Sequence, residues 1–140
     1  MTRPLADMPR ATRAAIRGVL ADIDDTITTE GKLTARAYAA LERLQRAGKL
    51  VVPITGRPAG WCDHIARMWP VDGVVGENGA LWMRYDAERR KLLRGYAASE
   101  DERRANRVRI DAVAARVLRE VPGTALASDQ PYREADIAID

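Results

Sequence analysis

Three acidic side chains lie close together near the start of the organised part of the chain. Asp22, Asp24 and Asp25 come at the end of the short apolar run 18–23. Because side chains alternate along a strand, we expect Asp22 and Asp24 to emerge on the same side. Carboxylates this close repel each other, and a hard cation such as Mg²⁺, bound through oxygen ligands, would relieve that repulsion. The residues also suit a simple turn, since aspartate and threonine favour turn positions.

A second segment with chemical potential is Thr55-Gly56-Arg57-Pro58, which directly follows the apolar run 50–54. It offers a hydroxyl and the free backbone N–H groups of a helix start, a combination that suits a phosphate group. If both apolar runs are parallel strands, this segment and the acids meet at the same edge of the sheet. Taken alone, the segment also fits an ordinary strand-to-helix turn, with Gly56 at the bend and Pro58 in the first helical turn.

The elements that must position these residues alternate between strand and helix as far as Gly79. Thr34 can cap a helix with apolar residues at three- and four-residue spacing, and Gly48 ends it. The predicted strands are 18–23, 50–54 and 73–75, and the predicted helices are 34–47 and 58–68. This order is typical of an α/β fold with a parallel sheet, and the first strand is expected to be buried on both faces.

The pattern changes after Gly79. Residues 81–85 and 91–96 predict an antiparallel hairpin, which we expect to be a different structural unit. Ser99 and Glu102 form a capping box ahead of a helix that Pro122-Gly123 ends, and 135–139 predicts a last strand. We therefore divide the chain into a frayed N-terminal lead-in, the first half of an α/β core, and part of a second, α+β domain. Their respective bounds are 1–16, 17–79 and 80–140.

Composition restricts the classes of partner. The 140 residues are 46% hydrophobic, enough for a globular core, and 23 basic against 20 acidic residues leave a net charge of only +3. The basic stretches are interleaved with acids and have no aromatic platform, so we expect no nucleic acid partner. No apolar run approaches the ~20 residues of a membrane span, so we expect no membrane partner. The single cysteine, Cys62, fits a reducing cytoplasm.

Together, these segments resemble the haloacid dehalogenase (HAD) superfamily of phosphohydrolases. Asp22-Ile23-Asp24-Asp25-Thr26 is similar to its first motif, Asp-x-Asp-x-Thr, and Thr55-Gly56-Arg57-Pro58 is similar to its second. Gly76-Glu77-Asn78-Gly79-Ala80 is similar to the segment that leads from core into cap in the branch with a large α/β cap. That branch includes sugar-phosphate phosphatases and phosphomannomutases. The first motif more often has glycine where Asp25 stands.

The resemblance implies a Rossmann-like core, an α+β cap, and Mg²⁺-dependent hydrolysis of a small phosphate ester, in particular a sugar phosphate, through an aspartyl-phosphate. Asp22 would be the nucleophile and Asp24 the general acid and base, and both would hold Mg²⁺, Asp24 through its backbone carbonyl. A carboxylate with an ordinary pKa near 3.9 is ionised at neutral pH and can attack without a base. The residues implied at the phosphate are Thr55, Gly56, Arg57 and Asn78.

Two later motifs of the superfamily, a lysine and a Gly-Asp carboxylate group, have no match here. Lys32, Lys49 and Lys91 lie in other segments, and neither Asp136 nor Asp140 follows a Gly-Asp pair. We therefore expect a fragment, a truncated chain, or a chain that requires a partner. The first strand would then be an exposed apolar edge, and we expect association to cover it.

Some of these features also occur in other classes of protein. Receiver domains of phosphorelay systems place the phosphorylated aspartate after the third strand, where this chain has Gly76-Glu77-Asn78. A catalytically inactive remnant that binds phosphate or a partner remains an alternative. We expect His64 to be packed or exposed rather than catalytic. Arg133 and Glu134 fit either a role in reading sugar hydroxyls or a solvated turn.

Overall fold

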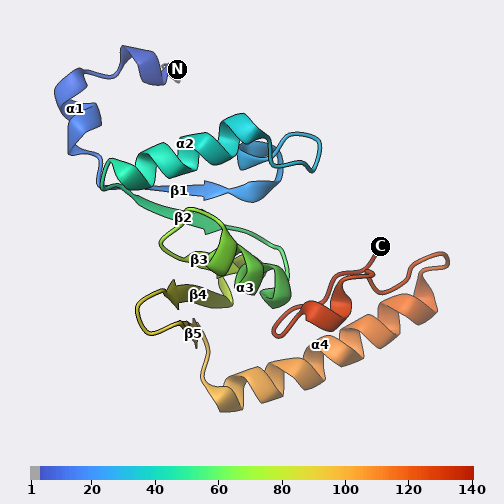
Figure 1. The fold of residues 1–140 in the computed structure, drawn as a ribbon. Helices are drawn as coiled ribbons and strands as arrows, with labels where there is room; N and C mark the ends of the chain where they lie inside the picture. The colour runs from blue at the N-terminus through green and yellow to red at the C-terminus, as the bar shows by residue number, and fades with distance from the viewer. Residues whose placement is uncertain (1–3) are drawn as a thin grey trace.

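The computed structural model describes residues 4–140 and contains one five-stranded sheet flanked by helices (Figure 1). The strands lie side by side in chain order; the first three are parallel, and the last two are antiparallel to their neighbours. The parallel α/β sheet predicted from the sequence is confirmed. The strands are β1 Gly18–Asp22, β2 Leu50–Ile54, β3 Val74–Gly76, β4 Leu81–Asp86 and β5 Lys91–Tyr96.

Two helices begin directly after the capping residues predicted from the sequence, and one further helix, at 10–15, was not predicted. The side chain of Thr34 accepts a hydrogen bond at the start of α2, and Ser99 forms the predicted capping box at the start of α4. Within the predicted lead-in, whose first three residues lie outside the described part, Arg10–Ala15 form α1 and Lys49 donates to the carbonyl of Ala14. Its alanines and arginines favour helix, and the bounds of the lead-in stay a prediction. The helices are α1 Arg10–Ala15, α2 Ala35–Arg46, α3 Ala59–Met68 and α4 Glu100–Glu120.

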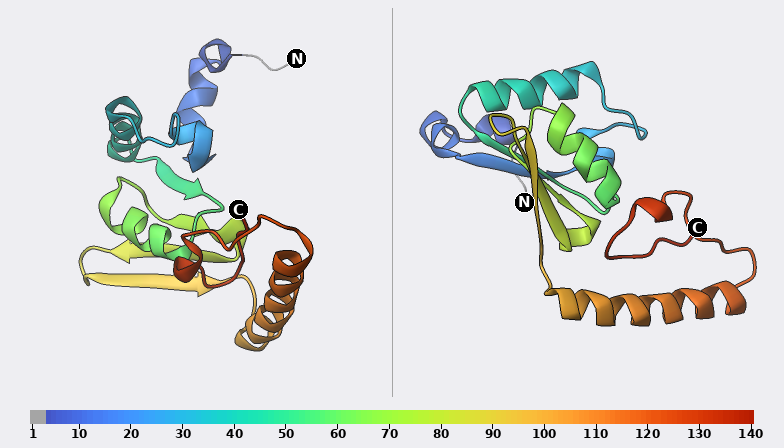
Figure 2. Two further views of the ribbon diagram at one scale, coloured as in Figure 1. Left: turned by 90° about the vertical axis from the view of Figure 1, so that its right-hand side faces the viewer. Right: turned by 60° about the horizontal axis from the view of Figure 1, so that its bottom comes forward.

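The core lies on one face of the sheet. Helices α2 and α3 lie on the same side of it (Figure 2), where Val51 and Met83 are buried. On the opposite face Leu20 is 67% exposed and Trp82 is 46% exposed. The prediction that the first strand is buried on both faces is therefore wrong. Because β1 is the edge of the sheet, the predicted exposed apolar edge is confirmed, while association through it stays a prediction.

The hairpin of β4 and β5 forms as predicted but does not start a separate unit. Strand β4 pairs antiparallel with β3, so the hairpin extends the same sheet. The reason is local: Glu77 and Asn78 take φ values of 47° and 57°, which reverses the chain within a few residues and returns it beside β3. The expectation of a different structural unit for the hairpin is thus wrong. Assigning the remainder of 80–140 to a cap stays a prediction.

The chain after α4 folds back toward α3 (Figure 1). A short 3₁₀ turn, Gln130–Tyr132, lies against α3. The strand predicted over 135–139 is wrong, because only a single bridge forms, between Leu126 and Ile139. The backbone N–H groups of Ala135 and Asp136 are directed to a side-chain carboxylate instead of to a neighbouring strand.

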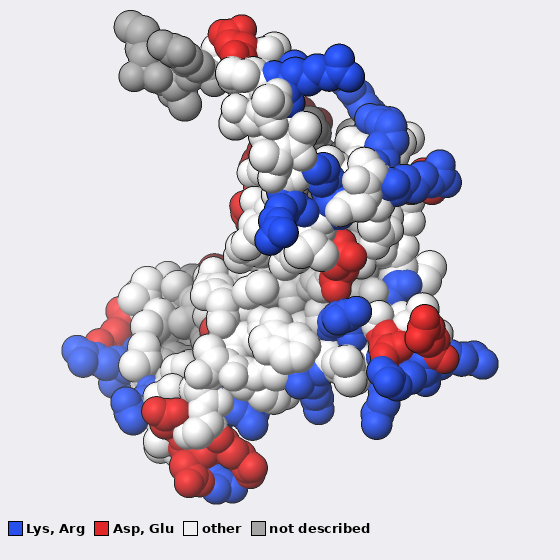
Figure 3. All heavy atoms as spheres, turned by 90° about the vertical axis from the view of Figure 1, so that its left-hand side faces the viewer, with Lys and Arg blue, Asp and Glu red and all other residues white. Residues whose placement is uncertain are grey.

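Charged side chains of both signs lie on the face drawn in Figure 3, with mainly Lys and Arg at the upper right and both signs together along the lower edge. The helices of the described chain are all too short or too polar to cross a membrane. The expected lack of a nucleic acid partner stays a prediction.

Candidate active site

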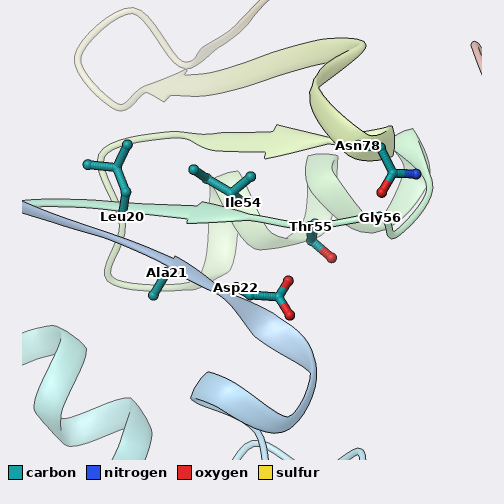
Figure 4. Close-up of a pocket in the computed structure, with 7 residues that line it drawn as sticks. All are labelled: Leu20, Ala21, Asp22, Ile54, Thr55, Gly56 and Asn78. Carbon is teal, nitrogen blue, oxygen red and sulfur yellow. The ribbon is translucent and has the colours of Figure 1, made fainter. Parts of the chain in front are cut away.

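Four of the predicted residues meet in one cleft at the carboxyl ends of the parallel strands. Asp22 ends β1, Thr55 and Gly56 follow β2, and Asn78 follows β3. The cleft has a volume of about 450 Å³. Figure 4 shows the Asp22 carboxylate and the Thr55 hydroxyl turned into the same space. The other lining residues are Leu20, Ala21 and Ile54. Parallel register explains the arrangement, since Asp22 is level with the last residue of β2.

The loop after β2 leaves the Thr55 hydroxyl able to donate a hydrogen bond. Thr55 is 3% exposed, and its Oγ1 accepts the N–H of Arg57 at 3.0 Å, which leaves the hydroxyl proton to donate. A Cβ on Gly56 would lie 2.9 Å from Oδ1 of Asn78, so a larger residue here would displace the Asn78 side chain from its present position. The N–H of Asn78 donates to the carbonyl of Thr55 at 3.1 Å and fixes the two loops together.

Asp24 and Arg57 form a bidentate pair. Nε and Nη2 of Arg57 donate to the two carboxylate oxygens of Asp24 at 3.0 and 2.8 Å. This hydrogen bonding raises the pKa of Arg57 above its ordinary value, against the effect of burial. The Arg57 guanidinium also lies over the ring of Trp61, 4.6 Å from its centroid. The predicted phosphate ligand Arg57 thus binds Asp24 in this structure rather than lining the cleft with Asp22.

The sequence predicted that strand alternation would place Asp22 and Asp24 on the same side. This prediction is wrong, because Asp24 lies beyond the end of the strand. The strand ends at Asp22, and a tight turn follows over Ile23–Ile27. Within it Asp25 has a φ of 56°, and its N–H donates to Oγ1 of Thr28 at 3.2 Å. A left-handed φ favours glycine, and aspartate is among the few other residues that tolerate it. This explains physically why Asp25 can stand where the related motif more often has glycine.

The turn gives a stability prediction. We expect Asp25→Gly to keep the free energy of unfolding within about 1 kcal/mol of the parent, because glycine adopts the positive φ without strain. Asp25→Val should lose about 1–3 kcal/mol, since a β-branched residue is strained there. Urea unfolding followed by circular dichroism measures both. Equal stability of the two variants would show that the turn does not impose this conformation.

The described residues do not form a complete magnesium site. Between residues 4 and 140 the structure holds no group of three His, Cys, Asp or Glu side chains placed to bind a metal ion. Asp22 offers a carboxylate, whereas both carboxylate oxygens of Asp24 already accept from Arg57. One carboxylate and one backbone carbonyl form a poor site for Mg²⁺. These residues alone therefore do not complete a site for Mg²⁺.

The chain's single cysteine and single histidine lie outside the cleft. Cys62 is buried, and burial raises the pKa of its thiol to about 12. A thiol of this kind is protonated at neutral pH and does not act as a nucleophile. His64 is exposed on α3, one of the two placements that the sequence favoured over a catalytic one.

The sequence did not single out Glu77, a buried carboxylate that holds together segments next to the cleft. Glu77 is 2% exposed. Its Oε1 accepts the N–H groups of Ala59 and Glu134 at 2.9 and 2.8 Å. Its Oε2 accepts those of Ala135 and Asp136 at 2.6 and 2.9 Å. One side chain therefore joins the first turn of α3 to the C-terminal segment. The available signal was an acid placed directly after an apolar strand.

The C-terminal segment reaches the loop after β2 through Arg133. Its side chain is 9% exposed. Its Nη1 donates to the carbonyl of Gly56 at 3.0 Å and to Oδ1 of Asp136 at 2.8 Å. Nδ2 of Asn78 donates to the other oxygen of Asp136 at 3.1 Å. Arg133 thus makes internal contacts and is not part of a solvated turn. No local sequence pattern predicts the hydrogen bond between Arg133 and Gly56, which are 77 residues apart.

From the surroundings of Glu77 we also expect the stability of the fold to fall at acid pH. Burial alone would raise the pKa of Glu77, but its four backbone hydrogen bonds together hold it below the ordinary 4.5. A carboxyl with a depressed folded pKa adds stability that is fully present above the unfolded pKa and is lost as pH falls through the folded pKa. We expect urea midpoints to fall as pH drops below about 4.5, and to fall less steeply in Glu77→Gln. Identical pH profiles for the two proteins would contradict this.

Comparison with known proteins agrees with the geometry. A family model described as haloacid dehalogenase-like hydrolase matches residues 19–105, more than half of the chain. A solved phosphatase of the haloalkanoate (HAD) enzyme superfamily from Bacteroides thetaiotaomicron is 26% identical, with a TM-score of 0.51. The match covers 78% of this chain and 38% of that one. No protein with a curated description matches significantly.

Two further solved structures share the fold. A protein of Thermoplasma acidophilum has a TM-score of 0.64 at 16% identity, over 89% of this chain and 51% of its own. A hypothetical protein from Geobacillus kaustophilus has a TM-score of 0.51 at 23% identity, over 79% and 38%. The chain thus spans between 38% and 51% of the length of the three structures it resembles. With its family model matched over strands β1 to β5, this chain belongs to the haloacid dehalogenase-like hydrolases.

Proposed function

We propose that the chain carries the nucleophile and the phosphate-binding loop of a phosphatase that acts on a small phosphate monoester, in particular a sugar phosphate. The observation that supports this most directly is the shared cleft of Asp22, Thr55, Gly56 and Asn78. The family and the similar phosphatase from Bacteroides thetaiotaomicron support the reaction class.

In the first proposed step a carboxylate oxygen of Asp22 attacks the phosphorus. An O–P bond forms to Asp22, and the P–O bond to the substrate's alcohol breaks. The Asp24 carboxyl gives its proton to the departing oxygen, so the alcohol leaves neutral. The Thr55 hydroxyl donates to a phosphoryl oxygen and holds the group in line. To act as an acid, Asp24 must release one of its two hydrogen bonds from Arg57.

In the second proposed step a water molecule attacks the phosphorus and gives its proton to the Asp24 carboxylate. The bond between Asp22 and phosphorus breaks, inorganic phosphate leaves, and both carboxyl groups return to their starting states. Asp24 therefore serves as acid and then as base, and its partial exposure allows the attacking water to reach it. The side chain of Asp24 is 41% exposed.

Magnesium dependence belongs to the same proposal. A bound Mg²⁺ would neutralise phosphate charge that otherwise repels the Asp22 carboxylate. Asp22 and the backbone carbonyl of Asp24 would hold it, together with at least one further oxygen ligand from outside the described residues.

A second candidate is a domain that binds phosphate without turnover. The engagement of both Asp24 oxygens by Arg57 and the partial metal site in the described residues favour it. This domain would use the same cleft, with Thr55 as a donor.

Phosphate release from a panel of sugar phosphates separates the two candidates. The chain is incubated with Mg²⁺ or with a chelator, and binding of inorganic phosphate is measured in parallel by calorimetry. Release that requires Mg²⁺ supports the phosphatase. Phosphate binding without release from a folded chain supports the binding domain. A folded chain that neither binds nor releases phosphate contradicts both.

A further inference from the structure

A second cleft opens between α3 and the C-terminal segment, with a volume of about 360 Å³. Its lining residues are Gly60, Trp61, His64 and Tyr132. Trp61 is 46% exposed and Tyr132 is 61% exposed, so two aromatic rings are available to a ligand. None of these residues has a role in the proposed chemistry. Clefts of this size with mostly apolar walls and a few polar groups are typical of small-molecule sites.

The Arg57 side chain connects Asp24 to Trp61, which lines the second cleft. The Arg57 guanidinium contacts the Asp24 carboxylate on one side and the Trp61 ring on the other. In the proposed reaction Asp24 gives its proton to the oxygen of the departing alcohol. The alcohol part of the substrate therefore lies toward Asp24 and Arg57, which is the side where Trp61 and the second cleft lie.

The C-terminal side of the second cleft, which Tyr132 forms, is held in place. A Cβ on Gly60 would lie 3.0 Å from the Cβ of Tyr132, so glycine allows Tyr132 to come close to α3. The N–H of Tyr132 donates to the carbonyl of Asp129 at 3.0 Å. The next residue, Arg133, is anchored to the carbonyl of Gly56. The same contacts that support the phosphate loop therefore also fix the width of the second cleft.

We propose that the second cleft binds the sugar ring of the substrate and so sets specificity for the alcohol part of the ester. A pyranose has an apolar C–H face that can stack on the Trp61 ring, and hydroxyl groups that can bond to Tyr132 and His64. The lining carries no Asp, Glu, Lys or Arg, which suits an uncharged ring rather than a second phosphate. This inference rests on the proposed function.

The test compares three probes: inorganic phosphate, glycerol 3-phosphate and glucose 6-phosphate. Binding is measured by calorimetry and by the indole N–H signals in NMR, in an Asp22→Asn background that prevents turnover. We expect glucose 6-phosphate to bind about tenfold more tightly than glycerol 3-phosphate and to shift the Trp61 signal. Trp61→Ala should remove this preference and leave the affinity for inorganic phosphate unchanged. Tyr132→Ala, at a more exposed position, provides a second test of whether the preference for glucose 6-phosphate depends on the second cleft.

Trp82→Ala is the matched control, because Trp82 has the same 46% exposure as Trp61 but lies on β4, outside the second cleft. It should keep the tenfold preference. Equal affinities for the two esters, or a preference that survives both Trp61→Ala and Tyr132→Ala, would overturn the inference. If phosphate binds without a ring preference, this inference alone fails. If none of the three probes binds and the folded parent chain releases no phosphate, the proposed function fails with it.

Discussion

Replacing Glu77 with alanine is expected to lower the free energy of unfolding by about 3–5 kcal/mol. The Glu77 carboxylate is buried and accepts four backbone N–H groups, one from the start of α3 and three from residues 134–136. Each buried donor that loses its partner costs about 1–3 kcal/mol, and water can satisfy only some of them. Urea unfolding of the full chain measures the loss.

Two variants control this experiment. Glu77→Gln keeps one oxygen but places an NH₂ group against two of the backbone donors, so it should lose about half as much stability as Glu77→Ala. Glu88→Ala removes an exposed carboxylate from the hairpin turn and should change stability by less than about 0.5 kcal/mol. If Glu77→Ala is as stable as Glu88→Ala, the carboxylate does not hold the C-terminal segment in solution.

Replacing Asp22 with asparagine is expected to reduce kcat/KM for phosphate release by on the order of 10⁴-fold or more. The amide has nearly the same shape as the carboxylate, so the cleft formed with Thr55 and Asn78 should persist. What is lost is the ionised oxygen that attacks phosphorus. Stability should be nearly unchanged, because Asp22 is exposed at the end of β1.

Asp25→Asn is the matched control for Asp22→Asn. It makes the same chemical change three residues later, at a position whose left-handed backbone asparagine also tolerates. Phosphate release should fall less than about tenfold in this variant, since Asp25 is outside the cleft lining. If the two variants lose activity equally, Asp22 has no special chemical role.

The strands and the meeting of Asp22 with Thr55 could be predicted because both depend on local patterns. An apolar run followed by polar residues marks the end of a strand, and parallel strands place their carboxyl ends at one edge. The caps at Thr34 and Ser99 were predictable for the same reason, since each satisfies N–H groups within a few residues.

The remaining features depend on contacts between distant segments. The bond from Arg133 to the carbonyl of Gly56 spans 77 residues, and those from residues 134–136 to Glu77 span almost 60. Those bonds also explain the wrong prediction for 135–139. Its alternating pattern suits a strand, but Glu77 takes two of the N–H groups that a strand would use. Likewise, no periodicity indicates that the hairpin returns beside β3.

The most direct test is to trap the phosphoryl group on the protein. The chain is mixed with Mg²⁺ and a sugar phosphate that it hydrolyses, quenched in acid, and analysed by intact and peptide mass spectrometry. We predict one added phosphoryl group, located on Asp22 and absent from the Asp22→Asn variant. Phosphate release with the group on another residue, or undiminished release from Asp22→Asn, would contradict the proposal that Asp22 is the nucleophile.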